Sequence, residues 1–219
     1  MKTSFSKLLT IGILAAFGAT TARAEIVNVT INGEVEWNFI TAPPLGGALV
    51  GQAAQLTFTV DSNNFQNNPQ FPTRGYPIDK ASFKLAFPTT EIGLQNPYPA
   101  GTPYFVIRNN DPAVDGFMVS EGTGFPDGVP LNQTGGFGNF ANAFHVTYEG
   151  ARLPSLNILD AIGSYNFTGL SVFNWTIQDG PVDAMGILFS DMTISVVPEP
   201  ATATVLFVPC ALFLRRRRT

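Results

Sequence analysis

The sequence predicts an all-β protein, built as a single antiparallel β-sandwich of the jelly-roll or immunoglobulin-like kind. Apolar and polar residues alternate in several stretches, and a repeat of two places successive side chains on opposite faces of a strand. The chain also contains 21 glycines and 17 prolines, which favour turns between many short strands. Amphipathic helices of normal length are not expected, although 155–162 could form one or two helical turns.

The clearest strand lies at 27–39. Apolar residues occupy its odd positions, with Gly33 as the exception, and polar residues occupy its even positions. The apolar set is Val27, Val29, Ile31, Val35, Trp37 and Phe39. We expect this set to face the core, the polar set to face water, and Gly33 to mark a bulge or bend.

Alternation returns further along the chain. The additional strands expected are 55–61, 82–87, 104–108, 116–120, 143–149, 165–177 with an interruption at Gly169, and 185–196. Three long connections, at 62–77, 88–103 and 121–142, are rich in asparagine, glycine and proline. Long loops inside compact domains are often functional, so any binding site is expected there first.

Residues 1–24 have the three parts of a secretory signal peptide. Two lysines precede an apolar run at 8–17, and Ala22 and Ala24 supply the small residues that a signal peptidase reads. An uncleaved membrane anchor is the alternative, but the run is shorter than the roughly 20 residues that span a bilayer. We therefore expect export, with a signal peptidase cutting after Ala24.

The C-terminal tail begins where the folded domain is expected to stop. Pro198 and Pro200 flank Glu199, and prolines so placed continue neither a strand nor a helix. The sequence therefore predicts one β-sandwich domain at 25–196 and a separate tail at 197–219.

An apolar segment at 201–214 follows these prolines. As a helix it would reach only about 21 Å at about 1.5 Å per residue, against a hydrocarbon core of about 30 Å. The segment is followed by Arg215, Arg216, Arg217 and Arg218. By the positive-inside rule the arginines stay cytoplasmic and the domain lies outside, which predicts a marginal, transient membrane insertion.

These three elements resemble the PEP-CTERM sorting signals of Gram-negative bacteria, which membrane enzymes called exosortases read. The matching residues are Pro198-Glu199-Pro200-Ala201, the apolar run through Leu214, and the arginine cluster. Pro209 and Cys210 depart from a continuous apolar helix but remove none of the elements.

The resemblance implies that the tail holds the precursor in the inner membrane and is removed near the PEP motif by an exosortase-like enzyme. The product would then reach the cell surface or the extracellular matrix, where extracellular polysaccharide is a candidate partner. A competing interpretation keeps the tail as a permanent anchor, with no sorting enzyme.

Charge and cysteine content limit the possible partners. Residues 25–196 carry 15 acidic and five basic residues, a net charge of −10, whereas nucleic-acid binding depends on lysine and arginine. We therefore expect no nucleic acid as a partner. The only cysteine is Cys210, so the predicted domain has no disulfide.

The sequence offers few candidate catalytic residues. His145 is the only histidine in the sequence. It should lie on the opposite strand face from Phe144 and Val146, towards solvent. No motif supplies the nucleophile or the orienting partner that a catalytic histidine needs. Glu34 and Glu36 share the polar face of the first strand and could serve a glycoside hydrolase, although acids on a solvated strand face are common. We expect a protein that is not an enzyme.

Residues 109–116 have the oxygen-rich composition of a calcium loop. Asp111 and Asp115 are the candidate ligands, but Ala113 occupies the third ligand position of the EF-hand spacing. The alternative is a turn between two strands, with Asp-Pro and Asp-Gly supplying the bends. No cofactor is expected, with calcium as the one candidate.

The leading hypothesis is an exported, non-catalytic surface or extracellular-matrix protein of unspecified role, sorted through its tail. The alternative is a carbohydrate- or calcium-dependent binding module that uses the long loops, and third comes a surface glycoside hydrolase.

Overall fold

The computed structural model describes residues 24–99, 101–180 and 183–198. Over these residues the chain forms one antiparallel sheet of 13 strands with two short 3₁₀ helices, so the all-β prediction is confirmed. The strands are β1 (Ile26–Asn38), β2 (Ala53–Asp61), β3 (Gln66–Asn67), β4 (Thr73–Pro77), β5 (Lys84–Phe87), β6 (Thr90–Ile92), β7 (Tyr104–Arg108), β8 (Val114–Ser120), β9 (Val129–Thr134), β10 (Asn139–Glu149), β11 (Gly163–Tyr165), β12 (Leu170–Asp179) and β13 (Asp183–Val196). The helices are η1 (Leu45–Gly47) and η2 (Ile158–Ala161).

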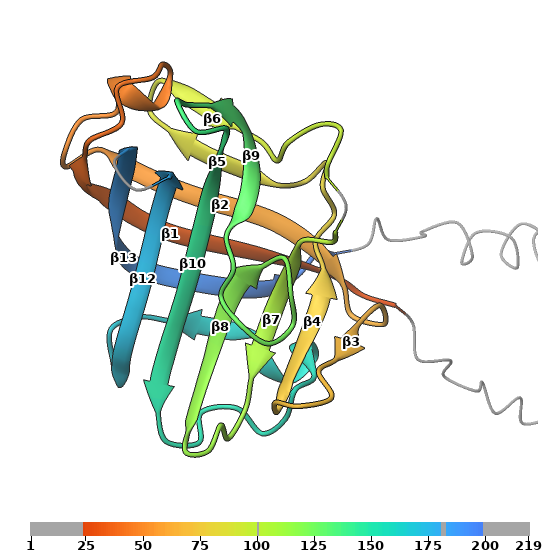
Figure 1. Cartoon of the computed structure of the whole chain (residues 1–219). Helices are drawn as coiled ribbons and strands as arrows, with labels where there is room; N and C mark the ends of the chain where they lie inside the picture. The colour runs from red at the N-terminus through yellow and green to blue at the C-terminus, as the bar shows by residue number, and fades with distance from the viewer. Residues whose placement is uncertain (1–23, 100, 181–182, 199–219) are drawn as a thin grey trace, which may run out of the picture.

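The sheet folds over into two layers that cross at a steep angle (Figure 1). Its strand order is β3-β4-β7-β8-β10-β12-β13-β1-β2-β5-β6, with β9 paired to β10 and β11 paired to β13. The front layer holds β4, β7, β8, β10 and β12, and the back layer holds β13, β1 and β2 (Figure 1). The layers join where the ends of β12 and β13 pair as a hairpin. A bridge between Val60 and Ile78 links them again at the far edge, so the sandwich is nearly closed.

The ladder between β1 and β13 has two bulges. The first lies opposite Asn32 and Gly33, but its extra residue is Ser190 of β13, so β1 pairs regularly with β2 through Gly33 and the predicted bulge is not in the first strand itself. The second lies between Val35 and Trp37, where Glu36 is the extra residue on β1. A bulge adds one residue to a strand and so exchanges the two faces beyond it. The expectation that Trp37 and Phe39 face the core was therefore wrong. Phe39 is 68% exposed, and the Trp37 ring lies where a Cβ on Gly186 would be.

Aromatic side chains fill the space between the layers. Phe105 of β7 stacks on Phe117 of β8 with ring centroids 5.7 Å apart, and Phe58 of β2 meets Phe105 from the opposite layer at 5.4 Å. All three are buried. Full burial of such a side chain contributes about 1.5–3 kcal/mol, so the many phenylalanines stabilise a core without disulfides.

The three long connections are partly strands. The first contains β3 and β4, the second contains β6, and the third contains β9 and the start of β10. These short strands were not predicted, because the connections are rich in polar and turn-forming residues. Strand pairing depends on a partner strand as well as on local alternation. Two other expectations hold: Gly169 interrupts the late segment with a φ of 74° between β11 and β12, and η2 supplies a short helical turn.

Both ends of the described domain lie together. The Val197 amide donates to the Ile26 carbonyl at 2.8 Å, and the Glu25 amide donates to Ser62 Oγ at 2.9 Å. Ala24 and Pro198 therefore leave from the same end of the back layer (Figure 1). The rest of the predicted signal peptide and of the tail lies outside the described residues, among which no helix is long and apolar enough to cross a membrane.

Two tyrosines near β11 predict a loss of stability at high pH. Burial raises the pKa of Tyr148 to about 12, and burial with the nearby Asp115 carboxylate raises the pKa of Tyr165 to about 12. Above the ordinary tyrosine pKa of about 10 the unfolded chain loses these protons first, so the folded state is progressively disfavoured. The urea midpoint should therefore fall as pH rises from about 10 to about 12.

Tyr148→Phe provides the check. The Tyr148 hydroxyl is buried and lacks a hydrogen-bond partner among the described residues. Its removal should leave stability at pH 7 unchanged or slightly higher and should reduce the alkaline loss. A midpoint independent of pH up to 12 would contradict the assignment.

Candidate functional site

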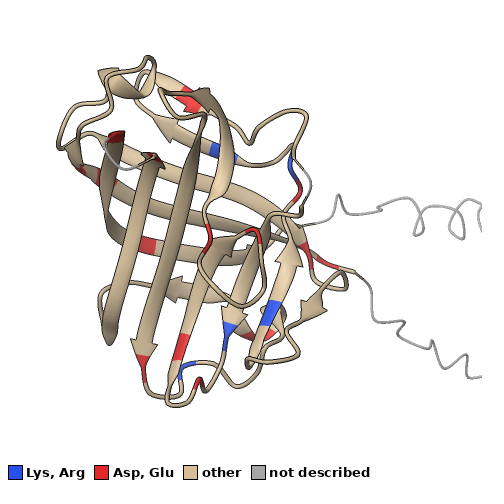
Figure 2. Ribbon diagram, viewed as in Figure 1, with Lys and Arg blue, Asp and Glu red and all other residues tan. Residues whose placement is uncertain are grey.

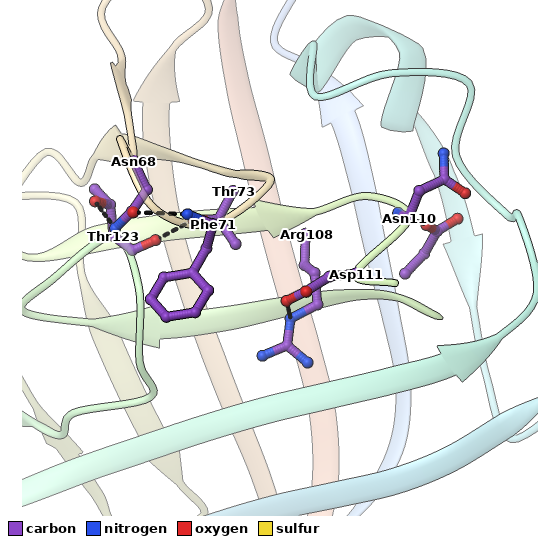
Figure 3. Close-up of polar contacts among 8 residues, drawn as sticks. Asn68, Phe71, Thr73, Arg108, Asn110, Asp111 and Thr123 are labelled. Atoms are coloured by element: carbon purple, nitrogen blue, oxygen red, sulfur yellow. Dashed lines mark hydrogen bonds and ion pairs between the residues drawn. The ribbon is translucent and has the colours of Figure 1, made fainter. Parts of the chain in front are cut away.

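The two calcium candidates have different partners in the structure. Asp115 is 1% exposed, and its carboxylate accepts hydrogen bonds from the amides of Asn110 (2.8 Å), Arg152 and Leu153 (2.6 Å). Asp111 instead forms an ion pair with Arg108, with 3.4 Å between Oδ2 and Nε (Figure 3). This arrangement is that of a turn, tied by Asp115 to the segment after β10.

A metal centre would need more ligands than these. Over the described ranges, no three histidine, cysteine, aspartate or glutamate side chains are grouped so that they could hold an ion. Calcium binding by Asp111 and Asp115 stays a prediction, which the substitutions in the Discussion test.

The two candidate acids of a glycoside hydrolase are exposed on β1. Glu34 pairs across from Leu188, and Glu36 is the residue at the second bulge. The two acids of this class flank the bond that is cleaved, in a cleft that holds the sugar, and an exposed strand face offers no such enclosure. The geometry fits acids on a solvated strand.

A short flap, residues 121–128, folds back over the outer face of the front layer. Thr123 holds it: its Oγ1 accepts from Asn68 Nδ2 at 3.1 Å, and its carbonyl accepts from Thr73 Oγ1 (Figure 3). At the tip, Phe125 packs edge-on against Phe71 with centroids 5.1 Å apart. The flap begins beside Tyr98, whose hydroxyl donates to Glu121 Oε1 at 2.9 Å.

Beside the flap lies a pocket of about 270 Å³, which we call the flap pocket. Adjacent strands β7, β8, β10 and β12 form its floor, and Pro126 of the flap forms one wall. Its side-chain lining includes Arg108, Met118, His145, Thr147 and Val172.

Strand register explains how these residues meet. Arg108, Gly116 and Thr147 lie side by side in one row across three strands, and Met118 and His145 are neighbours in the next row. Gly116 has no side chain between Arg108 and Thr147, which leaves the floor open. A Cβ at Gly116 would also lie 2.4 Å from the Val146 carbonyl oxygen, so the close approach of β8 and β10 requires glycine there.

Two buried nitrogens of residues that line the flap pocket lack hydrogen bonds. His145 Nδ1 and Arg108 Nε are both buried without a hydrogen-bond partner among the described residues, and the Asp111 contact of Arg108 has only ion-pair distance. Burial, and then the positive charge of Arg108, lower the pKa of His145, so its imidazole is neutral at pH 7. Buried polar atoms are almost always paired, so the unpaired Nδ1 of His145 is unusual, whereas Arg108 Nε retains the Asp111 carboxylate as a neighbour.

The sequence predicted the correct strand face for the His145 side chain but not its surroundings. Its side chain is opposite to the buried Phe144 and Val146, as expected, yet it is half-buried in the flap pocket rather than free in solvent. Arg108 was not predicted to join it. The only sign of Arg108 in the sequence was that it is a basic residue at the end of an apolar strand. Its position beside His145 depends on strand order and register, which the alternation of apolar and polar residues does not give.

Comparisons with known proteins add no identification. No family model matches the chain, and searches of curated proteins and of solved structures gave no match. The functional argument therefore rests on the sequence and on the structure described above.

Proposed function

We propose that this chain is an exported, non-catalytic protein displayed at the bacterial cell surface or in the extracellular matrix, sorted through its C-terminal tail. The order of PEP motif, apolar segment and arginine cluster in the sequence carries the proposal. An exosortase-like enzyme would act near Pro198, Glu199 and Pro200 after signal peptidase has cut after Ala24.

The position of the two ends supports this assignment. Because β1 begins where β13 ends, both expected cleavage points lie at one end of the sandwich. A precursor held at that end would direct the opposite end outward. That end carries the loop after β1, where Leu49 and Val50 are exposed (Figure 1).

The test is the intact mass of the native protein, measured separately in the cell-surface or medium fraction and in the membrane fraction. We expect a released species that begins at Glu25 and ends near Pro198–Pro200. The matched control replaces Glu199 with glutamine, which should slow release if the PEP motif is read. If every copy retains Arg215–Arg218 and stays in the membrane, the sorting proposal is wrong and the tail is a permanent anchor.

A second candidate function is a carbohydrate- or calcium-dependent binding module. The flap pocket favours it, because one of the long connections that the sequence singled out forms its wall. A glycan array with and without calcium separates display alone from display with binding. The hydrolase alternative is checked by Glu34→Gln and Glu36→Gln, since an unchanged rate of any activity found would remove both residues from it.

A further inference from the structure

We propose that an exposed aromatic patch at the end of β1, centred on Trp37 and Phe39, binds a neutral oligosaccharide chain. This site lies away from the flap pocket and gives the binding-module candidate, on which it rests, a location and a ligand class. It does not depend on how the protein is sorted.

The aromatic patch consists of two rows of residues that lie side by side across β1, β13 and β12. The rows are Trp37, Gly186 and Thr176, and next to them Phe39, Ala184 and Gln178. Met185 of β13 and Ile177 of β12 lie between the rows and are buried. Because successive side chains of a strand point to opposite faces, both rows face outward.

The two aromatic rings of the patch are accessible. Phe39 is 68% exposed, and its ring centroid lies 5.5 Å from that of Trp37 at an angle of 33°. Three indole atoms of Trp37 lie within 2.7 Å of the point that a Cβ on Gly186 would occupy, so the ring lies across β13 in the space that glycine leaves. The backbone of β13 thus supports one side of the indole, and the ring stays partly exposed.

These rings and their polar neighbours match the two kinds of surface on a sugar. The face of an aromatic ring is negative, and it attracts the slightly positive C–H groups on one side of a pyranose ring. Thr176 and the exposed Gln178 supply a hydroxyl and an amide for the sugar hydroxyls. They lie two strands from β1, about 10 Å at the usual strand spacing, so a ligand that reaches both is a chain of several sugars.

The charge around the patch favours a neutral ligand. The strands β1, β10, β12 and β13 carry carboxylates and no lysine or arginine (Figure 2). Glu34 and Glu36 are exposed on the strand that carries both rings. An acidic polysaccharide or an anionic lipid surface would be repelled, because no basic residue on these strands offsets the like charges.

The patch is too small to hold a second copy of the chain. An aromatic side chain buries about 150–250 Å², so the four rings of two copies would bury about 600–1,000 Å² together. Specific protein–protein interfaces bury about 1,200–2,000 Å². A slender sugar chain needs no such area.

The patch is also preformed and lies far from the ends of the domain. The β1–β13 ladder starts at Val27 paired with Val196, beside both ends, and finishes at Asn38 paired with Met185, within the patch. The Asn38 side chain donates to two carbonyls of the following loop at 2.9 Å each, which orders the end of β1. A preformed surface loses less entropy on binding, and a domain held by its ends would present this one outward.

The test uses the full chain, purified in a zwitterionic detergent without a sugar head group, and three probes: cellohexaose, the hexamer of galacturonic acid, and glucose. Of the two tryptophans, Trp175 is 1% exposed and its Nε1 donates to Asn142 at 3.0 Å. Quenching of the fluorescence by acrylamide therefore reports on Trp37. We expect cellohexaose to protect Trp37 in a saturable titration and to bind at least about tenfold more tightly than either other probe.

Phe39→Ala is the decisive variant, and Phe65→Ala is its control. Phe65 is 44% exposed, directly before β3 at the edge of the sheet, where the Arg74 guanidinium packs over its ring at 3.9 Å. In calorimetric titrations we expect F39A and W37A to weaken cellohexaose binding at least about tenfold and F65A to leave it unchanged. Thermal melting confirms that each variant is folded, and F39A decides the matter if W37A is not.

Four results would overturn the proposal. They are the absence of Trp37 protection by cellohexaose, equal binding of the acidic hexamer, unchanged binding in F39A, and a dimer in sedimentation experiments that F39A dissociates. Glycan binding that survives F39A would support a binding module with its site elsewhere, so the site and the module can fail separately. Neither result bears on the mass measurement that tests sorting.

Discussion

Asp115→Ala should lower the free energy of unfolding by about 3–5 kcal/mol, the range for breaking a buried charged contact. The carboxylate is 1% exposed and accepts from the amides of Asn110, Arg152 and Leu153. Alanine would leave all three amides without this acceptor, the buried Leu153 amide among them, and would release the segment after β10. At about 2–4 °C per kcal/mol for a domain of this size, the Tm should fall by about 10 °C.

Asp111→Asn is the matched control, because Asp111 belongs to the same turn but is more exposed. Its ion pair with Arg108 is partly solvated, and such pairs contribute about 0–1 kcal/mol. Melting each protein with calcium and with a chelator tests the calcium candidate. If calcium raises the Tm of the unmodified chain and both substitutions abolish that increase, the two carboxylates share an ion.

Gly33→Ala should destabilise the protein by about 3 kcal/mol, at the upper end of the cost of overpacking. Gly33 of β1 lies opposite the bulge at Ser190 of β13, and a Cβ there would lie 2.4 Å from the Leu188 carbonyl oxygen and 2.9 Å from Trp175. The nearer of these two atoms, the Leu188 carbonyl oxygen, belongs to the backbone of β13 in the longest ladder of the sheet. It cannot move without disturbing the pairing of β1 with β13.

Gly47→Ala is the control for this substitution. A Cβ at Gly47 meets no atom within 4 Å, and its φ is not in the left-handed region. Its effect should stay within about 0.5 kcal/mol, as for most surface changes. Equal urea midpoints for G33A and G47A would show that β1 can shift at the bulge and that the close approach is not obligatory.

Much of the fold was predictable from local alternation. The pattern from Val27 to Val35 identified the first strand and its inward face, because a buried strand face requires apolar residues at every second position. It failed at Trp37, because a second bulge at Glu36 has no glycine to mark it in the sequence. Short strands such as β9 were missed because their pairing depends on distant partners.

The flap pocket was less predictable than the fold. Arg108 and His145 lie on strands separated in the sheet by β8, and Pro126 reaches them only because the flap folds back. Alternation gave the face of His145 but not its neighbours. Those neighbours depend on strand order and register, which are long-range properties that one sequence does not specify.

The shared exit of the two ends has a mechanical consequence. Hydrogen bonds between antiparallel strands lie perpendicular to the strands, and the β1–β13 ladder runs from Val27 paired with Val196 to Asn38 paired with Met185. When both ends are pulled apart, this ladder opens one pair at a time, as a zipper does. When the force instead acts between Val197 and a contact at the opposite end of the sandwich, it runs along β13 and loads the whole ladder in shear. A domain held through both of its ends would therefore peel under force, whereas one held through Val197 and at the opposite end would resist it.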